Sequence, residues 1–389
     1  MSATDEWTEA LRRYALQLTI TARLSNATAD RYMRHLGWLA AAAPCGPWAV
    51  QPQWLGDWVS AQEWSKSTHR NVLVAIRGFY VWGIRSEQIE ISPLLGMPGS
   101  VLRGISGPAR MQPSSLWHEP LEAYLRRLQA ANRAVSTQKM YRDRLMAFSY
   151  LFRDPWRVTE QNIIDYLARD DWSAENKHAA RTTLRGFYRW AHRAGFIDRD
   201  PAEHIPAVHR VRALPRPAPT DVLLDALHKC DDRTRLAIQL GLYAGLRRAE
   251  IAAVRVADIQ GDQLLVRGKG GKHRIVPIHP ELQASLRAEL SRRDEAKVTT
   301  PWLFPSASPQ RAGNHVTPQH MATLISEALG DGWSTHMLRH RFASQAYAAQ
   351  RDLRAVQELL GHSRPETTAI YAAVPDGARA AAVAGIRLV

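Results

Sequence analysis

The sequence predicts a mainly α protein with a small β-sheet, in which a helical module is present twice and a different domain follows. Apolar residues recur at helical spacing through most of the 389 residues, for example at Leu11, Tyr14 and Leu18. Two short stretches, 263–267 and 274–278, alternate like strands on either side of a Gly/Lys-rich turn. An internal repeat in the first half completes the predicted architecture.

The repeat consists of four blocks at a nearly constant offset. The motif Arg-Gly-Phe-Tyr-x-Trp at 77–82 recurs letter for letter at 185–190, an offset of 108 residues. Three further matches keep nearly the same register: 28–32 with 137–141, 57–59 with 165–167, and Pro93 with Pro201. We therefore predict a duplicated module of about four helices per copy. The aromatic residues of the repeated motif should pack inward, with its arginine outward.

The expected boundaries follow from the repeat and from two stretches rich in glycine, proline or serine, which favour linkers. We expect helical modules at 1–98 and 117–206, a third domain at 220–389, and linkers at 99–116 and 207–219. The second linker is basic and stiffened by prolines, which suits a segment that follows a phosphate backbone between two domains.

The net charge of +14 and the pI near 10.1 indicate a polyanionic partner. The positive excess occurs in all three parts of the chain, as expected for a protein that grips DNA along its length. Cys45 and Cys230 are too few and too far apart for a disulfide framework or a metal site. Apolar runs too short for a membrane helix and an acidic, polar N-terminus predict a protein of the cytoplasm.

The stretch that begins at His336 predicts a helix. Ser334 or Thr335 can cap a helix that starts at His336. His336 and Arg339 are three residues apart and therefore share one face of its first turn.

A second short helix is expected at about 352–360, ending at Gly361 in a left-handed C-cap that presents His362. The segment 363–366, Ser-Arg-Pro-Glu, has the form of a capping box with a proline in the first turn. It predicts a third helix that carries Tyr371.

Two further motifs precede this region. In Gly-Leu-Arg-Arg-Ala-Glu-Ile at 245–251, Glu250 lies three residues after Arg247 and can fix its guanidinium. The predicted hairpin turn, Gly-Lys-Gly-Gly-Lys-His, carries Lys269 and Lys272. It lacks the P-loop pattern, so nucleotide hydrolysis is not supported.

Together these motifs closely resemble the tyrosine recombinase (phage integrase) family. The resemblance rests on Gly-Leu-Arg-x-x-Glu, the Gly-Lys-Gly hairpin, His-x-Leu-Arg-His, Leu-Leu-Gly-His and a tyrosine nine residues later. Ala244 departs from the family's threonine. The implied catalytic set is Arg247, Lys269, His336, Arg339, His362 and Tyr371, with Glu250 in support and Lys272 as the rival of Lys269 for general acid.

The resemblance implies phosphoryl transfer on DNA without a cofactor or metal. Two arginines and His362 would hold nonbridging oxygens, and Lys269 would protonate the leaving 5′-oxygen. His336 would act as proton donor or acceptor. Tyr371 would be the nucleophile, giving a 3′-phosphotyrosyl link and a free 5′-hydroxyl without ATP.

The helical modules resemble the SAM-like core-binding domain of this family, which usually has one copy. The first copy is therefore an additional DNA-binding domain or a protein–protein contact. The resemblance implies that the alanine-rich tail at 378–384 forms a helix that docks on a neighbouring protomer, and a frayed end is the alternative. The candidate DNA contacts are Arg70, Arg77, Lys177, Arg181, Arg185 and Lys272.

The expected function is a site-specific recombinase, an integrase of a phage or mobile element. It would act as a tetramer on two DNA duplexes through a Holliday junction, in the cytoplasm at the nucleoid. Double-stranded DNA, further copies of the chain and accessory DNA-bending or directionality proteins are the expected partners. A type IB topoisomerase and a non-catalytic DNA-binding protein on the same fold are the alternatives.

Overall fold

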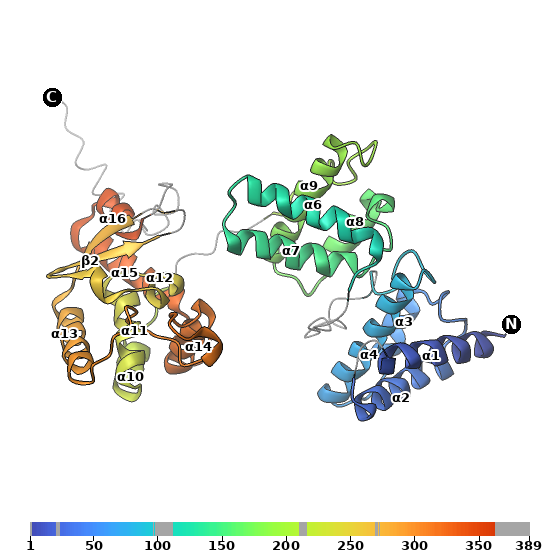
Figure 1. The fold of residues 1–389 in the computed structure, drawn as a ribbon, viewed down its shortest axis with the longest axis horizontal. Helices are drawn as coiled ribbons and strands as arrows, with labels where there is room; N and C mark the ends of the chain where they lie inside the picture. Colours follow the sequence, from blue (N-terminus) through green and yellow to red (C-terminus); the bar gives the residue numbers. More distant parts are fainter. Residues whose placement is uncertain are drawn as a thin grey trace, which may run out of the picture. The chain divides into compact units, whose positions relative to one another are not determined.

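The computed structural model describes residues 2–20, 24–95, 97, 112–209, 216–268, 271 and 273–361. Its contacts divide the chain into two compact units, 1–211 and 212–389, each of which is described by itself. The predicted class, mainly α with a small sheet, is confirmed (Figure 1). The predicted third helix of the 336–371 segment and the tail at 378–384 lie outside the described residues.

The first helical module contains four helices, α1 (Ala3–Ile20), α2 (Asn26–Ala42), α3 (Pro52–Ser60) and α4 (Lys66–Arg85). Helix α4 begins after Ser65, whose side chain accepts a hydrogen bond from the Thr68 amide. Phe79 on α4 is fully buried, and Trp7 and Trp48 stack on its ring. The motif's aromatic residues thus pack inward, as predicted.

The second module repeats this arrangement with η1 (Ser115–Trp117), α6 (His118–Ala130), α7 (Val135–Ser149), η2 (Pro155–Arg157), α8 (Glu160–Leu167) and α9 (Ala174–Arg193). Phe187 takes the place of Phe79, and Trp117 stacks on it at 5.8 Å and 20°, against 5.6 Å and 20° for Trp7. The internal repeat therefore reproduces the packing of its core as well as its letters.

The repeated glycine has a packing role in both modules. A Cβ on Gly78 would lie 2.5 Å from the Tyr14 hydroxyl, and one on Gly186 would lie 2.5 Å from the Tyr124 hydroxyl. Each tyrosine comes from the first main helix of its module and crosses the last helix at this point. Glycine fits here because a Cβ would collide with the tyrosine hydroxyl that crosses the helix at this point.

Backbone hydrogen bonds and ion pairs join the two modules within the first unit. The Ser92 amide donates to the Leu151 carbonyl and the Arg153 amide donates to the Glu90 carbonyl, both at 2.9 Å. The Arg153 guanidinium also pairs with Glu87 at 2.6 Å and with Glu90 at 2.5 Å.

Apolar side chains cross the same junction. Leu95, from the first module, belongs to the core of the second, and Leu151 packs against both cores. The predicted outward orientation of Arg77 is wrong, because its guanidinium lies over the Tyr150 ring, 5.8 Å from its centre. Burial lowers the pKa of Arg77 from its ordinary value. A basic residue that looks solvent-facing in an isolated module here lies against its neighbour.

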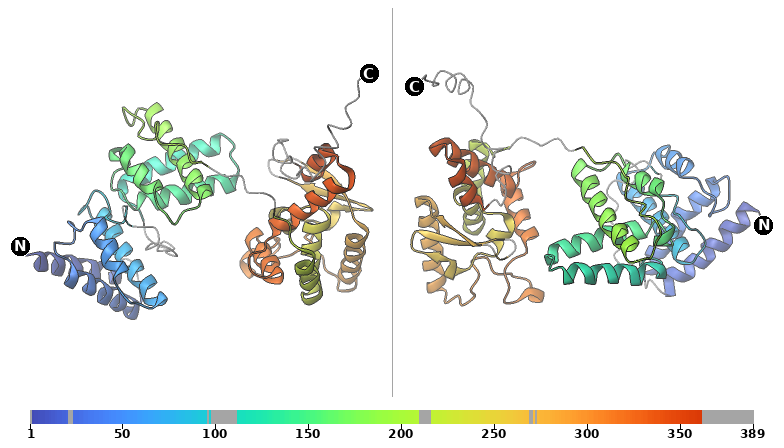
Figure 2. Two further views of the ribbon diagram at one scale, coloured as in Figure 1. Left: turned by 180° about the vertical axis from the view of Figure 1, so that it is seen from behind. Right: turned by 90° about the horizontal axis from the view of Figure 1, so that it is seen from above.

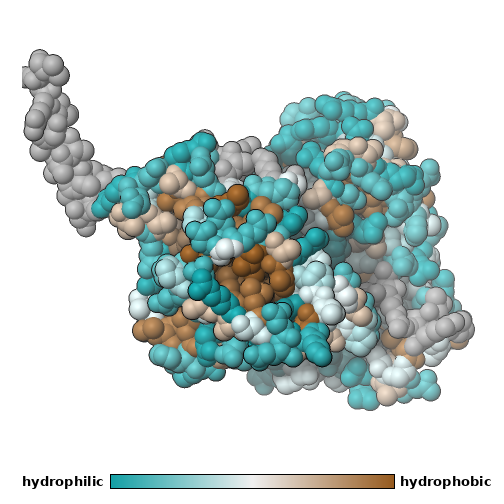
Figure 3. Space-filling model, turned by 60° about the vertical axis from the view of Figure 1, so that its left-hand side comes forward, coloured by the Kyte–Doolittle hydropathy of each residue, from teal (hydrophilic) through white to brown (hydrophobic). Residues whose placement is uncertain are grey.

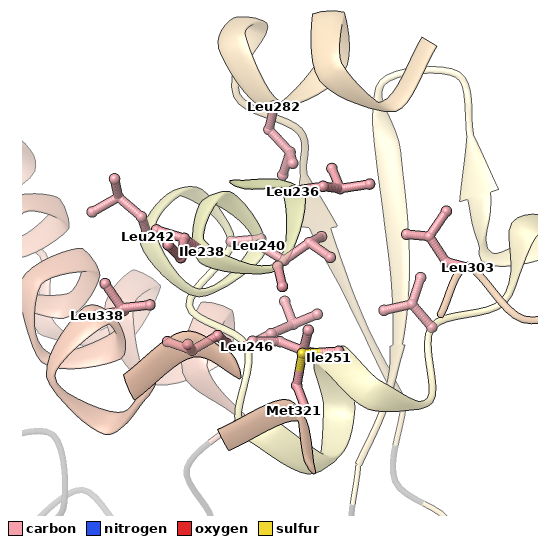
Figure 4. Packing of buried hydrophobic residues seen from close by; sticks show 14 of the residues in the cluster. Leu236, Ile238, Leu240, Leu242, Leu246, Ile251, Leu282, Leu303, Met321 and Leu338 are labelled. Atoms are coloured by element: carbon pink, nitrogen blue, oxygen red, sulfur yellow. The ribbon is translucent and has the colours of Figure 1, made fainter. Parts of the chain in front are cut away.

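The second unit surrounds helix α11 (Asp232–Tyr243), in which every residue from Leu236 to Leu242 is buried (Figure 4). Leu240 on α11 packs with Ile251, Met321 and Leu338, which come from three other helices. The remaining helices are α10 (Thr220–Lys229), α12 (Arg248–Ala252), η3 (Val256–Asp258), α13 (Pro280–Glu295), η5 (Pro309–Arg311), α14 (Pro318–Leu329), α15 (Thr335–Gln350) and α16 (Leu353–Leu360).

The sheet is antiparallel, in the order β1 (Ile259–Gln260), β2 (Gln263–Arg267) and β3 (His273–Pro277). Arg267 pairs with His273, which closes the predicted hairpin, and the two-residue strand β1 was not predicted. Helix α16 packs against β3 and α15 (Figure 2).

Strand alternation determines which side chains of β3 face inward. Val276 is buried, and Arg274, two residues earlier, lies on the same side of the strand. Ile275 points the other way and is 58% exposed. The surface in Figure 3 is mainly hydrophilic, with separate hydrophobic patches. Among the described helices, none combines the length and apolar character that a bilayer-crossing segment requires.

Candidate active site

The structure describes four of the seven residues predicted for catalysis and its support, namely Arg247, Glu250, His336 and Arg339. Lys269, His362 and Tyr371 lie outside the described residues, as does Lys272.

Arg247 and Glu250 form the predicted pair at the start of α12. The Glu250 carboxylate accepts from the Arg247 amide at 2.9 Å and from its guanidinium at 2.8 Å. The Glu250 side chain is 5% exposed and that of Arg247 is 42% exposed. The carboxylate therefore fixes one end of the guanidinium while the arginine remains accessible to a ligand.

The turn before Arg247 requires a glycine for two reasons. Gly245 has φ +63°, in the left-handed region that other residues disfavour. A Cβ there would also lie 2.5 Å from the Phe342 ring on α15. The turn can therefore approach α15 closely, and the Gly245 carbonyl accepts from the Arg339 guanidinium at 2.6 Å.

Arg339 is buried, with 1% of its side chain exposed. Its guanidinium donates to the carbonyls of Gly245 and Leu360, each at 2.6 Å. The Leu360 carbonyl belongs to the last turn of α16, where carbonyl groups have no N–H partner within the helix. Arg339 thus joins α15 to the turn before Arg247 and to the end of α16.

Glu250 lies among three guanidinium groups. Arg274 makes a bidentate pair with it at 3.0 and 2.9 Å, and an Arg339 nitrogen lies 3.9 Å away. Burial raises the pKa of the Glu250 carboxyl, but hydrogen bonds and charge from Arg274 and Arg247 outweigh it and lower the pKa to about 2. The carboxylate is therefore ionised at every physiological pH.

Three predicted residues line one open pocket of about 410 Å³, namely Arg247, His336 and Arg339. His336 is exposed at this pocket, on the first turn of α15. Partial desolvation lowers the pKa of His336, and the charges of Arg339 and Arg247 act in the same direction. At neutral pH the imidazole is thus neutral, able to donate from one nitrogen and accept at the other.

The predicted local structure around His362 is confirmed up to Gly361. Asp352 caps α16 by accepting from the amides of Arg354 and Ala355. Gly361 ends the helix with φ +64° and ψ +44°, the left-handed C-cap that the sequence predicted.

Sequence reasoning missed Arg274. It donates from Nε to the Leu359 carbonyl at 2.7 Å in addition to its pair with Glu250. The alternation of 274–278 carried the signal, because it places residues 274 and 276 on one face of a strand whose other face is exposed. A charged residue at an inward position requires a partner.

The described candidate DNA contacts lie on two helices, α4 and α9. Arg70 is exposed on α4, whereas Arg77 lies at the junction of the modules. Arg181 donates to the carbonyls of Pro206 and Ile205 at 2.6 and 2.9 Å and so holds the end of the second module. Lys177 and Arg185 are half-buried on α9. Their contact with DNA stays a prediction.

Comparison with known proteins identifies the family. Residues 219–377 match the protein-family model described as the phage integrase family. The tyrosine recombinase XerC of Chromobacterium violaceum is 32% identical over 270 residues, which cover 66% of this chain and 90% of that protein. XerC of Azotobacter vinelandii is 37% identical over 202 residues, covering 49% of this chain and 66% of that protein.

Solved structures share the fold. XerH recombinase bound to a palindromic difH substrate has a TM-score of 0.52 at 21% identity, covering 84% of this chain and 98% of that one. A lambda integrase fragment bound to a core site has a TM-score of 0.52 at 22% identity, covering 65% and 94%. The architecture, the arginine–glutamate arrangement and these relatives together mean that the chain belongs to the phage integrase family of tyrosine recombinases.

Proposed function

We propose that the protein is a site-specific DNA recombinase that cleaves and rejoins DNA through a 3′-phosphotyrosyl intermediate. The observation that carries this proposal is the pocket in which Arg247, Arg339 and His336 meet, with Glu250 fixing the first arginine. A phosphodiester gains negative charge as it becomes pentacoordinate. Fixed cations directed at that charge are the main source of catalysis in such a site.

In the proposed reaction the Tyr371 oxygen attacks the phosphorus and the bond to the 5′-oxygen breaks. Lys269 gives its proton to the leaving oxygen, and Arg247, Arg339 and His362 hold the nonbridging oxygens. His336, neutral at physiological pH, donates to or accepts from a group at the phosphate. Rejoining reverses these steps with a 5′-hydroxyl from a second strand. The phosphotyrosyl bond conserves the energy of the broken bond, so no nucleotide is consumed.

Exchange of strands between two duplexes requires several active sites in one assembly. A solved lambda integrase tetramer bound to a Holliday junction has a TM-score of 0.51 at 21% identity to this chain. We infer the same kind of assembly here, on double-stranded DNA in the cytoplasm, for the integration or excision of a phage or mobile element. Accessory DNA-bending or directionality proteins fit this role.

The first helical module is proposed to extend the DNA-binding surface. Arg31 and Arg34 are exposed on α2, and Arg70 is exposed on α4. His35 interacts with the backbone of Asn71, so Arg34 and Arg70 lie at the same level of two packed helices. Exposed arginines on adjacent helices suit the phosphates of duplex DNA.

A triple substitution of Arg31, Arg34 and Arg70 by glutamine tests the role of this module, with Arg12→Gln on α1 as the control. We expect a shorter DNA footprint and a salt dependence of log K that weakens by about 0.9 for each phosphate that the variant no longer neutralises. An unchanged footprint with an unchanged salt slope would mean that the first module does not bind DNA.

Covalent trapping tests the catalytic proposal. The protein is incubated with sheared genomic DNA of its source, quenched with SDS, and the attached fragments and the modified peptide are sequenced. Adducts on Tyr371 at one recurring sequence, absent from Tyr371→Phe, are expected. Adducts scattered over all sequences would identify a type IB topoisomerase. No adduct in either protein would leave a DNA-binding protein without cleavage activity.

A further inference from the structure

We propose that Arg274 is a positioning residue that holds the segments carrying the catalytic groups in register with one another. The inference rests on the proposed recombinase function and concerns a residue outside the predicted catalytic set. Three segments meet at its guanidinium: the start of α12, strand β3 and the end of α16.

The first contact is with Glu250. Arg274 and Glu250 form a bidentate pair at 3.0 and 2.9 Å, with side chains 10% and 5% exposed. Each Glu250 oxygen is shared with a nitrogen of Arg247. Because Arg274 occupies part of the carboxylate's acceptor capacity, Arg247 is oriented by Glu250 without being fully neutralised by it. Its remaining positive charge is then available to the phosphate.

The second contact is with the end of α16. The Arg274 Nε donates to the Leu359 carbonyl at 2.7 Å, and Arg339 satisfies the next carbonyl, that of Leu360. A Cβ on Gly361 would lie 3.1 Å from the Arg274 Cδ, so the residue before His362 packs directly on this side chain. Arg274 thereby holds the last turn of α16, directly before the residue that precedes His362.

The third connection is through the sheet. Arg274 is the second residue of β3, and Lys269 precedes it by five residues in the same hairpin. Val266 is its partner on β2. Anchoring Arg274 therefore anchors the base of this hairpin to the carboxylate that orients Arg247. The same hairpin carries Lys269, the proposed general acid.

Only an arginine can make this set of contacts. The planar guanidinium places two nitrogens on a carboxylate and directs Nε sideways to a carbonyl. Lysine supplies a single nitrogen and would keep the charge without the fixed geometry. The consequence is specific: removal of Arg274 should slow the chemical step on bound DNA and leave DNA affinity largely unchanged.

The experiment compares Arg274→Lys and Arg274→Gln with a matched control, Arg292→Gln. Arg292 also makes a bidentate pair with a glutamate, Glu289, with both contacts at 2.8 Å, but this pair lies on the exposed face of α13. The substrate is the duplex recovered by covalent trapping with the wild-type protein. For each full-length variant we would measure the Kd for this duplex and the single-turnover rate of the Tyr371 adduct at saturating protein.

We expect both Arg274 variants to form the adduct about 100-fold more slowly than wild type, as a misplaced catalytic group does, with a Kd within a small factor of wild type. Arg292→Gln should retain the wild-type rate. A folded Arg274→Lys protein with the wild-type adduct rate would overturn the inference, because the charge alone would then suffice. A decrease in rate that is fully explained by weaker DNA binding would also overturn it.

A second readout does not depend on DNA or on activity. Hydrogen–deuterium exchange of the full-length proteins should show faster exchange of the α16 amides in the Arg274 variants, relative to Arg292→Gln. Unchanged exchange in α16 would refute the proposed anchoring even if the rate falls. If wild type forms no adduct, the recombinase proposal fails, while this measurement still decides whether Arg274 positions α16.

Discussion

Replacing Gly186 by alanine is expected to destabilise the protein, whereas the same replacement in a Tyr124→Phe background should stabilise it. The added Cβ would lie 2.5 Å from the Tyr124 hydroxyl, closer than any real contact. The next atoms are ordinary neighbours, the Tyr141 Cε1 at 3.5 Å and the Tyr124 Cζ at 3.8 Å. The conflict is therefore with one oxygen, which the phenylalanine lacks.

The magnitude follows from two opposing terms. Overpacking a well-packed core costs about 1–3 kcal/mol. Alanine in place of glycine inside a helix contributes about 1 kcal/mol of stability. With Tyr124 present, the alanine should therefore cost about 1 kcal/mol, and with phenylalanine it should stabilise by about 1 kcal/mol. The coupling between the two sites is then about 2 kcal/mol, within the range measured for residues in contact.

Urea unfolding of the four proteins measures this cycle from the change in midpoint at constant m-value. The first module supplies an internal repetition of the experiment, because Gly78 and Tyr14 have the same 2.5 Å relation. If alanine stabilises the protein in both backgrounds, the tyrosine moves aside without cost and the packing argument is refuted.

Three further predictions concern charge. Arg153→Glu should lower the unfolding free energy by about 1 kcal/mol, as expected for a small surface network. Adding Glu87→Arg and Glu90→Arg should restore part of this loss, measured by urea midpoints. Equal midpoints in all variants would contradict the prediction. The folded pKa of Glu250, about 2, lies below the ordinary 4.5, so its stabilisation of about 3 kcal/mol is present above pH 4.5 and is lost as the pH falls through about 2. Glu250→Gln should remove that pH dependence, and a wild-type acid profile in the variant would show that the ion pair contributes nothing. Burial, with the charge of His336 and Arg339, lowers the pKa of His340 to about 4. The free energy of unfolding should therefore decrease as the pH falls from 6.5 toward 4. Urea midpoints measured over this pH range should decrease less in His340→Gln than in wild type.

Much of the fold could be predicted because its signals are local. Helical spacing and the left-handed Gly361 depend on neighbouring residues, and the structure confirms them. The Arg247–Glu250 pair was also predictable, since the two residues are three apart on one helix start.

The missed features depend on residues distant in sequence. Arg274 lies 24 residues from Glu250, and no local pattern joins them. Arg77 was expected to point outward because a charged side chain on a helix of an isolated module normally faces solvent. Its neighbour Tyr150 belongs to the other copy of the repeat, and amphipathic patterns carry no information on which surfaces of two modules meet.

The junction between the modules has a consequence for how a duplicated segment persists in evolution. The second core includes Leu95 of the first copy, and the backbone at Leu151 and Arg153 is hydrogen-bonded to residues that precede the linker. A deletion of the first copy would therefore uncover apolar side chains and backbone groups of the second and lower its stability. Selection for folding alone would then retain the extra module, so its retention is by itself no sign that it contacts DNA.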